Sequence, residues 1–101
     1  MTLEELEKIV AKRSAAKPED SWTARLLSEG PEKCAEKFGE EAVEAIIEAV
    51  KGDNERLAAE TADVLFHLLV MLKSRDVALS EVMRILEARQ AQSGLEEKRS
   101  R

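Results

Sequence analysis

Aromatic residues, cysteine, glycine and proline are all scarce in this sequence of 101 residues. It contains one Trp, two Phe, no Tyr, four Gly and two Pro, so it has few of the residues that favour β-strands. Its single cysteine, Cys34, excludes an internal disulfide bond and a zinc site made of thiolates. Nothing in the composition points to an oxidising compartment, and we expect a cytoplasmic protein.

A basic surface and a long apolar segment are also missing. Acidic residues outnumber basic ones by 21 to 16, which gives a formal net charge of -5, and such a surface repels the phosphate backbone of a nucleic acid. The chain opens on acidic residues without the basic start of a secretory signal, and no apolar run approaches the roughly 20 residues that span a bilayer. We expect a small-molecule partner, and neither nucleic acid nor membrane.

Helix-forming residues, mainly Ala, Leu, Glu, Lys and Arg, dominate what is present. Apolar spacing and capping residues predict helices at about 3–13, 22–29, 31–51, 54–74 and 79–92. Short connections make neighbouring helices antiparallel. We therefore predict an all-α protein, an antiparallel bundle of four to five helices that forms a single domain over residues 1–92, with a charged tail over 93–101. The apolar circumference from Val64 to Leu72 is too large for about 100 residues to cover, so dimerisation is expected to complete the bundle.

Charged residues form a stripe along the predicted helix 31–51. At about 100° per residue, one narrow wedge of this helix holds Lys37, Glu40, Glu41, Glu44 and Glu48. The opposite side holds Ala35, Phe38, Ala42, Ile46 and Ala49. Alone, such a stripe is typical of the solvated face of an amphipathic helix.

The next predicted helix changes this interpretation, because it is apolar nearly all round in its second half and its polar residues need partners. Glu60 and Asp63 lie three residues apart on one face of it. Since Glu44 and Glu60 each lie 8 residues from Gly52, antiparallel pairing brings Glu41 and Glu44 opposite Glu60 and Asp63. Four carboxylates this close repel one another unless cations lie between them. Ligands that are all oxygen favour Mg²⁺, with Mn²⁺ as the alternative.

Three segments occur in an order and at a spacing that identify a family. They are SWTARLL at 21–27, KFGEEAVE at 37–44 and ETADVLFHLL at 60–69. With them the sequence resembles the phosphoribosyl-ATP pyrophosphohydrolases of histidine biosynthesis, which belong to the all-α, MazG-like nucleoside triphosphate pyrophosphohydrolases. The two acidic segments mark the superfamily, and the Ser-aromatic-Thr run selects this member.

This resemblance implies hydrolysis of 1-(5-phosphoribosyl)-ATP to 1-(5-phosphoribosyl)-AMP and pyrophosphate, the second step of L-histidine biosynthesis. Water would attack between the α and β phosphates with the help of bound Mg²⁺ or Mn²⁺. The metal ligands, which are also catalytic residues, would be Glu41, Glu44, Glu60 and Asp63. We expect Glu40 to orient the attacking water or a ligand, and to act as general base if its neighbours raise its pKa. The resemblance also points to a homodimer.

Such a substrate carries a phosphorylated ribose at its base, which ATP lacks, and this group requires cationic or hydroxyl donors away from the acids. The candidates are Ser21, Thr23, Arg25 and Lys33, all upstream of Glu40. Solvated surface charge explains Arg25 and Lys33 equally well.

Three further residues have competing interpretations. Trp22 is expected to pack in the core, with stacking on the substrate base as the alternative. Lys37 is expected to form a salt bridge with Glu41, with neutralisation of substrate phosphate as the alternative. His67 either hydrogen-bonds Asp63 and so orients a metal ligand, or is an ordinary core histidine, and a direct bond to the metal is the least favoured role.

Two other functions remain open at this point. A house-cleaning pyrophosphohydrolase of nonstandard nucleoside triphosphates would share every metal ligand and differ only around the base. A helical interaction module without enzymatic activity would have acids that are merely solvated, and it would not bind divalent cations tightly.

Overall fold

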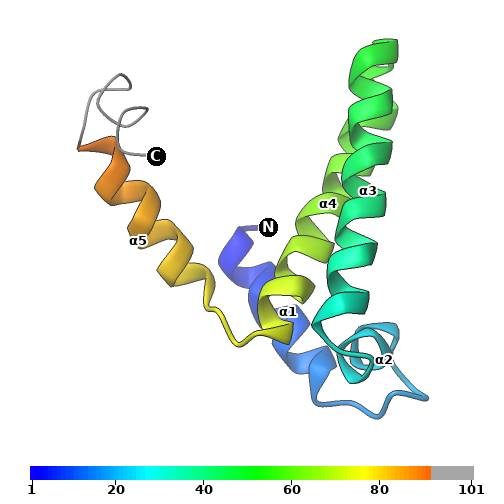
Figure 1. Ribbon diagram of the computed structural model, residues 1–101, viewed down its shortest axis with the longest axis vertical. Coiled ribbons are helices and arrows are strands. Elements are labelled where there is room, and N and C mark those ends of the chain that lie inside the picture. The colour runs from blue at the N-terminus through cyan, green and yellow to red at the C-terminus, as the bar shows by residue number, and fades with distance from the viewer. Residues whose placement is uncertain (92–101) are drawn as a thin grey trace.

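The computed structural model describes residues 1–91, and every regular element within them is an α-helix (Figure 1). The helices are α1 (Leu3–Ser14), α2 (Trp22–Ser28), α3 (Pro31–Lys51), α4 (Asn54–Ser74) and α5 (Leu79–Gln90). The predicted all-α class is confirmed, and the predicted helix ends differ from the observed ones by about one or two residues. None of these helices is long and apolar enough to cross a membrane. Gln92 and the predicted tail at 93–101 lie outside the described residues.

The helix ends follow directly from capping residues in the sequence. Thr2 and Glu5 form a reciprocal capping box at the start of α1, with both hydrogen bonds at 3.1 Å. The Ser21 hydroxyl and the Asp53 carboxylate each accept a backbone N–H three residues on, also at 3.1 Å, and so begin α2 and α4. Gly52, with a φ of 82°, adopts the left-handed conformation that ends α3.

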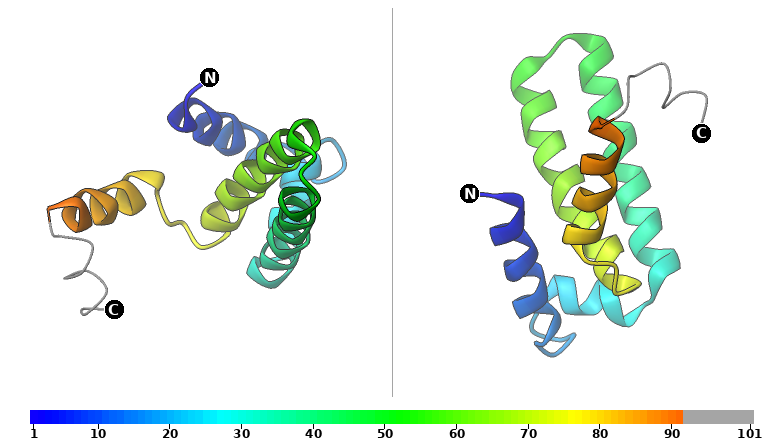
Figure 2. Two further views of the ribbon diagram at one scale, coloured as in Figure 1. Left: turned by 90° about the horizontal axis from the view of Figure 1, so that it is seen from above. Right: turned by 90° about the vertical axis from the view of Figure 1, so that its left-hand side faces the viewer.

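An antiparallel hairpin of α3 and α4 runs the length of the molecule, and α1 and α2 gather near its open end (Figure 1, Figure 2). α1 packs against α4, while α2 contacts α1 and both helices of the hairpin. The thiol of Cys34 is buried and donates to the Leu26 carbonyl at 3.4 Å, as expected for a small buried side chain. The buried apolar core consists of Val10, Leu26, Cys34, Leu69, Val70 and Leu79.

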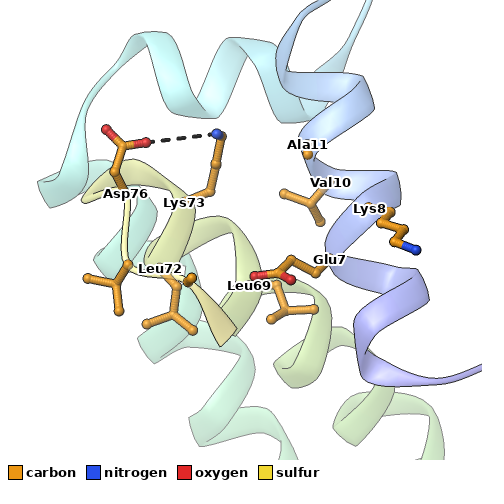
Figure 3. Close-up of a pocket in the computed structure, with 10 residues that line it drawn as sticks. Glu7, Lys8, Val10, Ala11, Leu69, Leu72, Lys73 and Asp76 are labelled. Atoms are coloured by element: carbon orange, nitrogen blue, oxygen red, sulfur yellow. Dashed lines mark ion pairs between the residues drawn. The ribbon is translucent and has the colours of Figure 1, made fainter. Parts of the chain in front are cut away.

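α5 leaves the bundle and stands apart from the hairpin (Figure 1). Its first residue, Leu79, is buried, and the Leu79 N–H donates to Glu7 Oε2 of α1 at 2.7 Å. A hollow of about 250 Å³ lies at this junction, and the ion pair of Lys73 and Asp76, at 3.8 Å, lies at its edge (Figure 3). α5 is therefore held to the bundle at its start, whereas Ile85 on its later turns is exposed.

α3 turns Glu41 and Glu48 of its charged stripe toward α4 and several large apolar residues outward. Glu41 is half-buried and Glu48 is buried against α4, where Arg56 and Lys51 each approach the Glu48 carboxylate to 3.6 Å. At these two positions the stripe is therefore not a solvated face, whereas Glu40 and Glu44 are exposed. On the outer side of α3, four large apolar side chains are exposed, with Ile46 at 60% and Val50 at 83%. These form what we call the α3 apolar ridge: Val43, Ile46, Ile47 and Val50.

The apolar segment 64–72 of α4 is less covered than the sequence suggested. Only His67, Leu69 and Val70 are fully buried, and the other six residues of the segment are half-buried. α1 covers this helix on one side and α3 on another, so 91 described residues leave part of its circumference accessible.

Candidate active site

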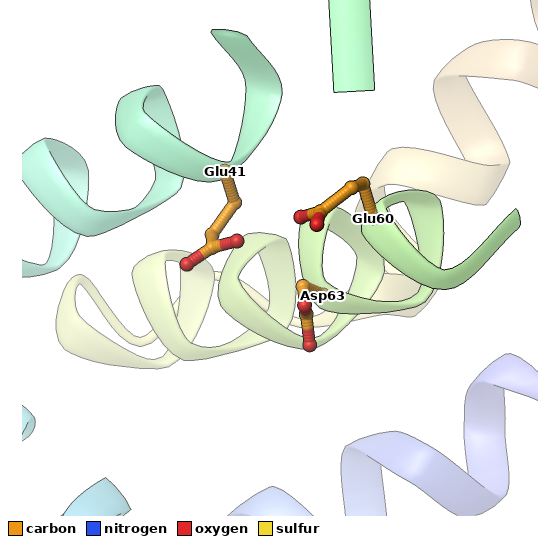
Figure 4. Close-up of side chains that lie close together, drawn as sticks. All are labelled: Glu41, Glu60 and Asp63. Carbon is orange, nitrogen blue, oxygen red and sulfur yellow. The ribbon is translucent and has the colours of Figure 1, made fainter. Parts of the chain in front are cut away.

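Three carboxylates from the two hairpin helices meet at one place. Glu41 comes from α3, and Glu60 and Asp63 come from α4 (Figure 4). Each offers one oxygen atom, and the three oxygens all lie within 4.8 Å of one another. The short turn at Gly52 sets this register, as the sequence predicted. We call these three residues the acidic cluster.

Glu44, the fourth predicted ligand, flanks this cluster. Its side chain is exposed, and its carboxylate raises the pKa of two cluster members. For Glu60, contact with Glu44 is the main cause of the raised pKa, followed by burial. The pKa of Glu41 is raised first by burial and then by the charges of Glu44 and Asp63. The charges of Glu44 and Asp63 thus oppose the ionisation of Glu41 and Glu60.

The chemistry of the cluster suits a divalent cation bound by oxygen atoms. Glu60 Oε2 is buried and has no hydrogen-bond partner among residues 1–91. An unpartnered buried carboxylate oxygen beside like charges is costly, and a cation between the carboxylates would relieve both problems. Carboxylate oxygens are the ligands that Mg²⁺ and Mn²⁺ prefer, so the residues fit such an ion.

Lys37 pairs with Glu40 and not with Glu41. Its Nζ lies 3.0 Å from Glu40 Oε2, because residues three apart also share a helix face. The predicted partner of Lys37 is therefore wrong. Lys37 also holds the pKa of Glu40 below its usual value. The condition for Glu40 to serve as general base, a raised pKa, is not met.

His67 is buried, and of the two roles that the sequence left open the hydrogen bond to Asp63 is not formed among the described residues. Its ring is 8% exposed, and within the described chain its Nδ1 has no hydrogen-bond partner. The ring instead packs edge-on against Phe66, with 5.4 Å between ring centroids. Burial, and then the charge of Lys37, lower the pKa of His67, so the neutral imidazole is favoured.

Trp22 lies at the surface, so the expectation of core packing is wrong. It is 54% exposed because it is the first residue of a short helix whose buried side is formed by Thr23, Ala24 and Leu26. Lys37 Nζ lies 5.9 Å from the centre of its ring. The indole thus lies beside the Lys37–Glu40 pair.

The predicted residues of the Ser-aromatic-Thr run line one hollow. Its volume is about 890 Å³, and it lies between the end of α1, the start of α2 and α4. We call it the tryptophan hollow. Its lining residues are Ile9, Lys12, Arg13, Ala16, Asp20, Ser21, Trp22, Thr23 and Phe66.

Two predicted cations lie elsewhere. Arg25 lines a separate hollow with Glu19 and Glu29, among others. Lys33 pairs with Glu36 at 3.6 Å on the exposed side of α3. Neither lines the tryptophan hollow.

Six lining residues of the tryptophan hollow were not predicted from the sequence, among them Lys12, Arg13 and Phe66. Lys12 and Arg13 lie in the last turn of α1, where basic residues complement the helix dipole. Their position in the sequence therefore gave no sign of a binding site. Phe66 belongs to the apolar segment 64–72 of α4, so it was interpreted as a core residue. The only signal for Phe66 was its position three residues after Asp63, one turn along the same helix. The loop that brings α2 back against α1 could not be placed from the pattern.

Comparison with known proteins gives one result over nearly the whole chain. The family model described as phosphoribosyl-ATP pyrophosphohydrolase matches residues 3–90. A phosphoribosyl-ATP pyrophosphatase of Cereibacter sphaeroides is 67% identical over 99 residues, which are 98% of this chain and 96% of the relative. Proteins of the same name from Dinoroseobacter shibae and Paracoccus denitrificans are 66% and 64% identical over 99 residues, which are 98% of this chain and 97% and 92% of the relatives. The similarity therefore covers every helix that positions the acidic cluster.

Proposed function

This chain belongs to the phosphoribosyl-ATP pyrophosphohydrolase family, and we propose that it hydrolyses 1-(5-phosphoribosyl)-ATP to 1-(5-phosphoribosyl)-AMP and pyrophosphate. It is a hydrolase of histidine biosynthesis that acts on a phosphoric anhydride. The bond that breaks joins the α and β phosphates, and the oxygen of water becomes part of one product phosphate.

The observation that carries this proposal is the convergence of Glu41, Glu60 and Asp63 from facing helices, with oxygens within 4.8 Å of one another. In our proposal these three residues hold Mg²⁺, or Mn²⁺, and Glu44 completes the ligand set. When bound, such a cation neutralises charge on the phosphate oxygens and lowers the pKa of a coordinated water. Glu44 supports this assignment because its carboxylate raises the pKa of both Glu41 and Glu60.

Glu40 and Lys37 act beside the cluster. Glu40 is an exposed carboxylate whose pKa is lowered, so it would accept a hydrogen bond from the attacking water and orient it, while the proton that the water loses would pass to bulk solvent. Lys37 fixes Glu40 by their ion pair and presents positive charge to the phosphates on the side of Trp22.

Substrate recognition involves the tryptophan hollow. The accessible indole of Trp22 offers a flat face on which a purine base stacks. Ser21 and Thr23 flank it, and the Ser21 hydroxyl keeps its proton available for donation because its oxygen accepts the Ala24 N–H.

The functional form is a homodimer in our proposal. The α3 apolar ridge (Val43, Ile46, Ile47 and Val50) is exposed on one continuous helix, and monomeric proteins rarely expose a patch of this kind. A second copy of the same ridge is a partner of matching chemistry. We place the enzyme in the cytoplasm because its thiol is free and its family is biosynthetic.

The proposal is tested by measuring pyrophosphate release from phosphoribosyl-ATP, ATP and a panel of modified nucleoside triphosphates, with Mg²⁺ and with EDTA. We expect a requirement for the cation and a kcat/KM for phosphoribosyl-ATP that exceeds that for ATP by at least about 100-fold. Faster hydrolysis of a modified triphosphate would favour the house-cleaning function. Absence of any hydrolysis and of cation binding would favour the interaction module.

A further inference from the structure

Two cations in the tryptophan hollow have no role in the reaction described so far. Lys12 and Arg13, from the last turn of α1, line this hollow. No ion pair within residues 1–91 involves either of them, although acidic residues outnumber basic ones in the chain. The Arg13 guanidinium lies over the Phe66 ring, 5.9 Å from its centre. A cation held above an aromatic ring keeps its outer N–H groups free to bind an anion.

One side chain borders both the tryptophan hollow and a hollow lined by one member of the acidic cluster. Phe66 lines the tryptophan hollow, and it also lines a neighbouring hollow together with Asp63. On the other side, Lys37 lies between Glu40 and the indole of Trp22. A ligand whose phosphates meet the acidic cluster would reach Arg13 by way of Phe66 and Trp22.

The remaining lining matches a sugar phosphate. A volume of about 890 Å³ is within the usual range for a small-molecule site. Trp22 and Phe66 supply flat apolar surface, and Ser21 supplies a hydroxyl group. Asp20, the one acid of the hollow, is an acceptor for the hydroxyl groups of a ribose, because an ionised carboxylate only accepts hydrogen bonds.

We infer that Arg13, supported by Lys12, binds the phosphate of the phosphoribosyl group that the substrate carries on its base, and so distinguishes this substrate from ATP. The inference rests on the proposed function. It replaces the expected cations Arg25 and Lys33, which lie outside the hollow, by two cations from α1. Guanidinium and phosphate form paired, charge-assisted hydrogen bonds.

The first test needs neither metal nor catalysis. Trp22 is the only tryptophan, so its fluorescence reports on the hollow directly. Ribose 5-phosphate is titrated into the full chain in EDTA, with ribose as the uncharged comparison. We expect saturable binding of ribose 5-phosphate and no binding of ribose. Arg13→Gln should raise its Kd by at least about tenfold, as expected for the loss of a charge-assisted hydrogen bond, and Arg13→Lys should fall between Arg13→Gln and the wild type.

Arg75→Gln is the matched control. Arg75 is exposed at the end of α4 and lines neither the tryptophan hollow nor the hollow that contains Asp63. The Kd of this variant for ribose 5-phosphate should therefore equal that of the wild type. Circular dichroism checks that each variant keeps its helices. Equal Kd values for the wild type and Arg13→Gln, or equal responses to ribose and ribose 5-phosphate, would overturn the inference.

The second test separates the inference from the proposed function. In Mg²⁺, Arg13→Gln should lower kcat/KM for phosphoribosyl-ATP at least about tenfold and change that for ATP less than about twofold. If phosphoribosyl-ATP is hydrolysed and Arg13→Gln has no effect, the inference is wrong and the function stands. If ribose 5-phosphate binds with the expected dependence on Arg13 but phosphoribosyl-ATP is not hydrolysed, the sugar-phosphate site stands and the function is wrong.

Discussion

Glu40 and Glu41 are adjacent in the chain, yet their carboxyl groups have pKa values shifted in opposite directions. The ion pair with Lys37 lowers the pKa of Glu40, whereas burial and neighbouring acids raise that of Glu41. Successive residues differ by about 100° around a helix, so Glu40 lies beside the hairpin and Glu41 faces α4. This difference assigns the two carboxylates different tasks, orientation of water for Glu40 and cation binding for Glu41.

Neutral variants of the ligands are expected to lose activity and gain stability in the absence of metal. Glu41→Gln, Glu44→Gln, Glu60→Gln and Asp63→Asn should each lower turnover by at least about 100-fold, since a ligand of the cation is lost. In EDTA, the same variants should melt at higher temperatures than the wild type because a repelling charge is removed. Added Mg²⁺ should raise the Tm of the wild type more than that of any variant.

Glu36→Gln is the control for these variants. Glu36 is an exposed acid on the same helix, and its ion pair with Lys33 is a surface pair of little energetic weight. Turnover and Mg²⁺ response should match those of the wild type. Full turnover in the Glu60→Gln or Asp63→Asn variant would refute the metal assignment.

Stabilisation by Mg²⁺ is expected to increase with pH. The pKa values of Glu41 and Glu60 are raised above 4.5 in the folded chain, so the folded state binds protons more tightly than the unfolded state. The contribution of these two residues to the stability of the folded state is therefore present below pH 4.5 and is lost as the pH rises through their raised pKa values. Calorimetry at about pH 5 and about pH 8, with and without Mg²⁺, should show the larger Tm increase at the higher pH. In the Glu60→Gln variant, the Tm increase caused by Mg²⁺ should depend less on pH.

His67 should make the folded state sensitive to acid. Its pKa is lowered from 6.5, so the unfolded state binds the proton more tightly. The contribution of His67 to the stability of the folded state is present above pH 6.5 and is lost as the pH falls through the lowered pKa of His67. Urea unfolding in EDTA at about pH 7.5 and about pH 5.5 should show a greater loss for the wild type than for His67→Leu. Parallel profiles for the two proteins would contradict this prediction.

A charge in the α3 apolar ridge should separate the proposed dimer. Ile46 is 60% exposed, and Ile46→Glu would place like charges close together across a two-fold interface. Sedimentation equilibrium should give twice the chain mass for the wild type and 11.3 kDa for Ile46→Glu. Lys17→Glu, a change at another exposed position outside the helices, should remain a dimer. A wild-type mass of 11.3 kDa at micromolar concentration would rule the interface out.

Much of the fold could be predicted because its boundaries are local. Thr2, Ser21 and Asp53 each cap the start of a helix, Gly52 ends α3 in the left-handed conformation, and such capping residues can be found in the sequence alone. The same turn fixes the register of the hairpin, so simple counting from Gly52 brought the acids together. The same counting also predicted that Glu41 lies opposite Glu60 and Asp63, whereas the exposure of Ile46 and Val50 on the outer side of α3 was not predicted.

The site was predicted where one turn determines it and missed where distant segments meet. The acidic cluster depends on the α3–α4 hairpin alone, whereas the tryptophan hollow combines α1, α2 and α4. Whether Trp22 is buried depends on how α2 lies against α1, and no local pattern encodes that. The choice between Glu40 and Glu41 as partner of Lys37 depends on rotamers, since both spacings are allowed on a helix.

The hydrogen bond from Leu79 to Glu7 joins residues 72 apart in sequence, whereas the α3–α4 hairpin forms around a turn of two residues, Gly52 and Asp53. Closing a longer loop costs more conformational entropy, so we expect the hairpin to form early in folding and the junction of α1 with α5 to form last. The same order should govern local opening of the native protein. In hydrogen exchange, the amide of Leu79 should therefore take up deuterium well before that of Val70, which lies in the middle of the core.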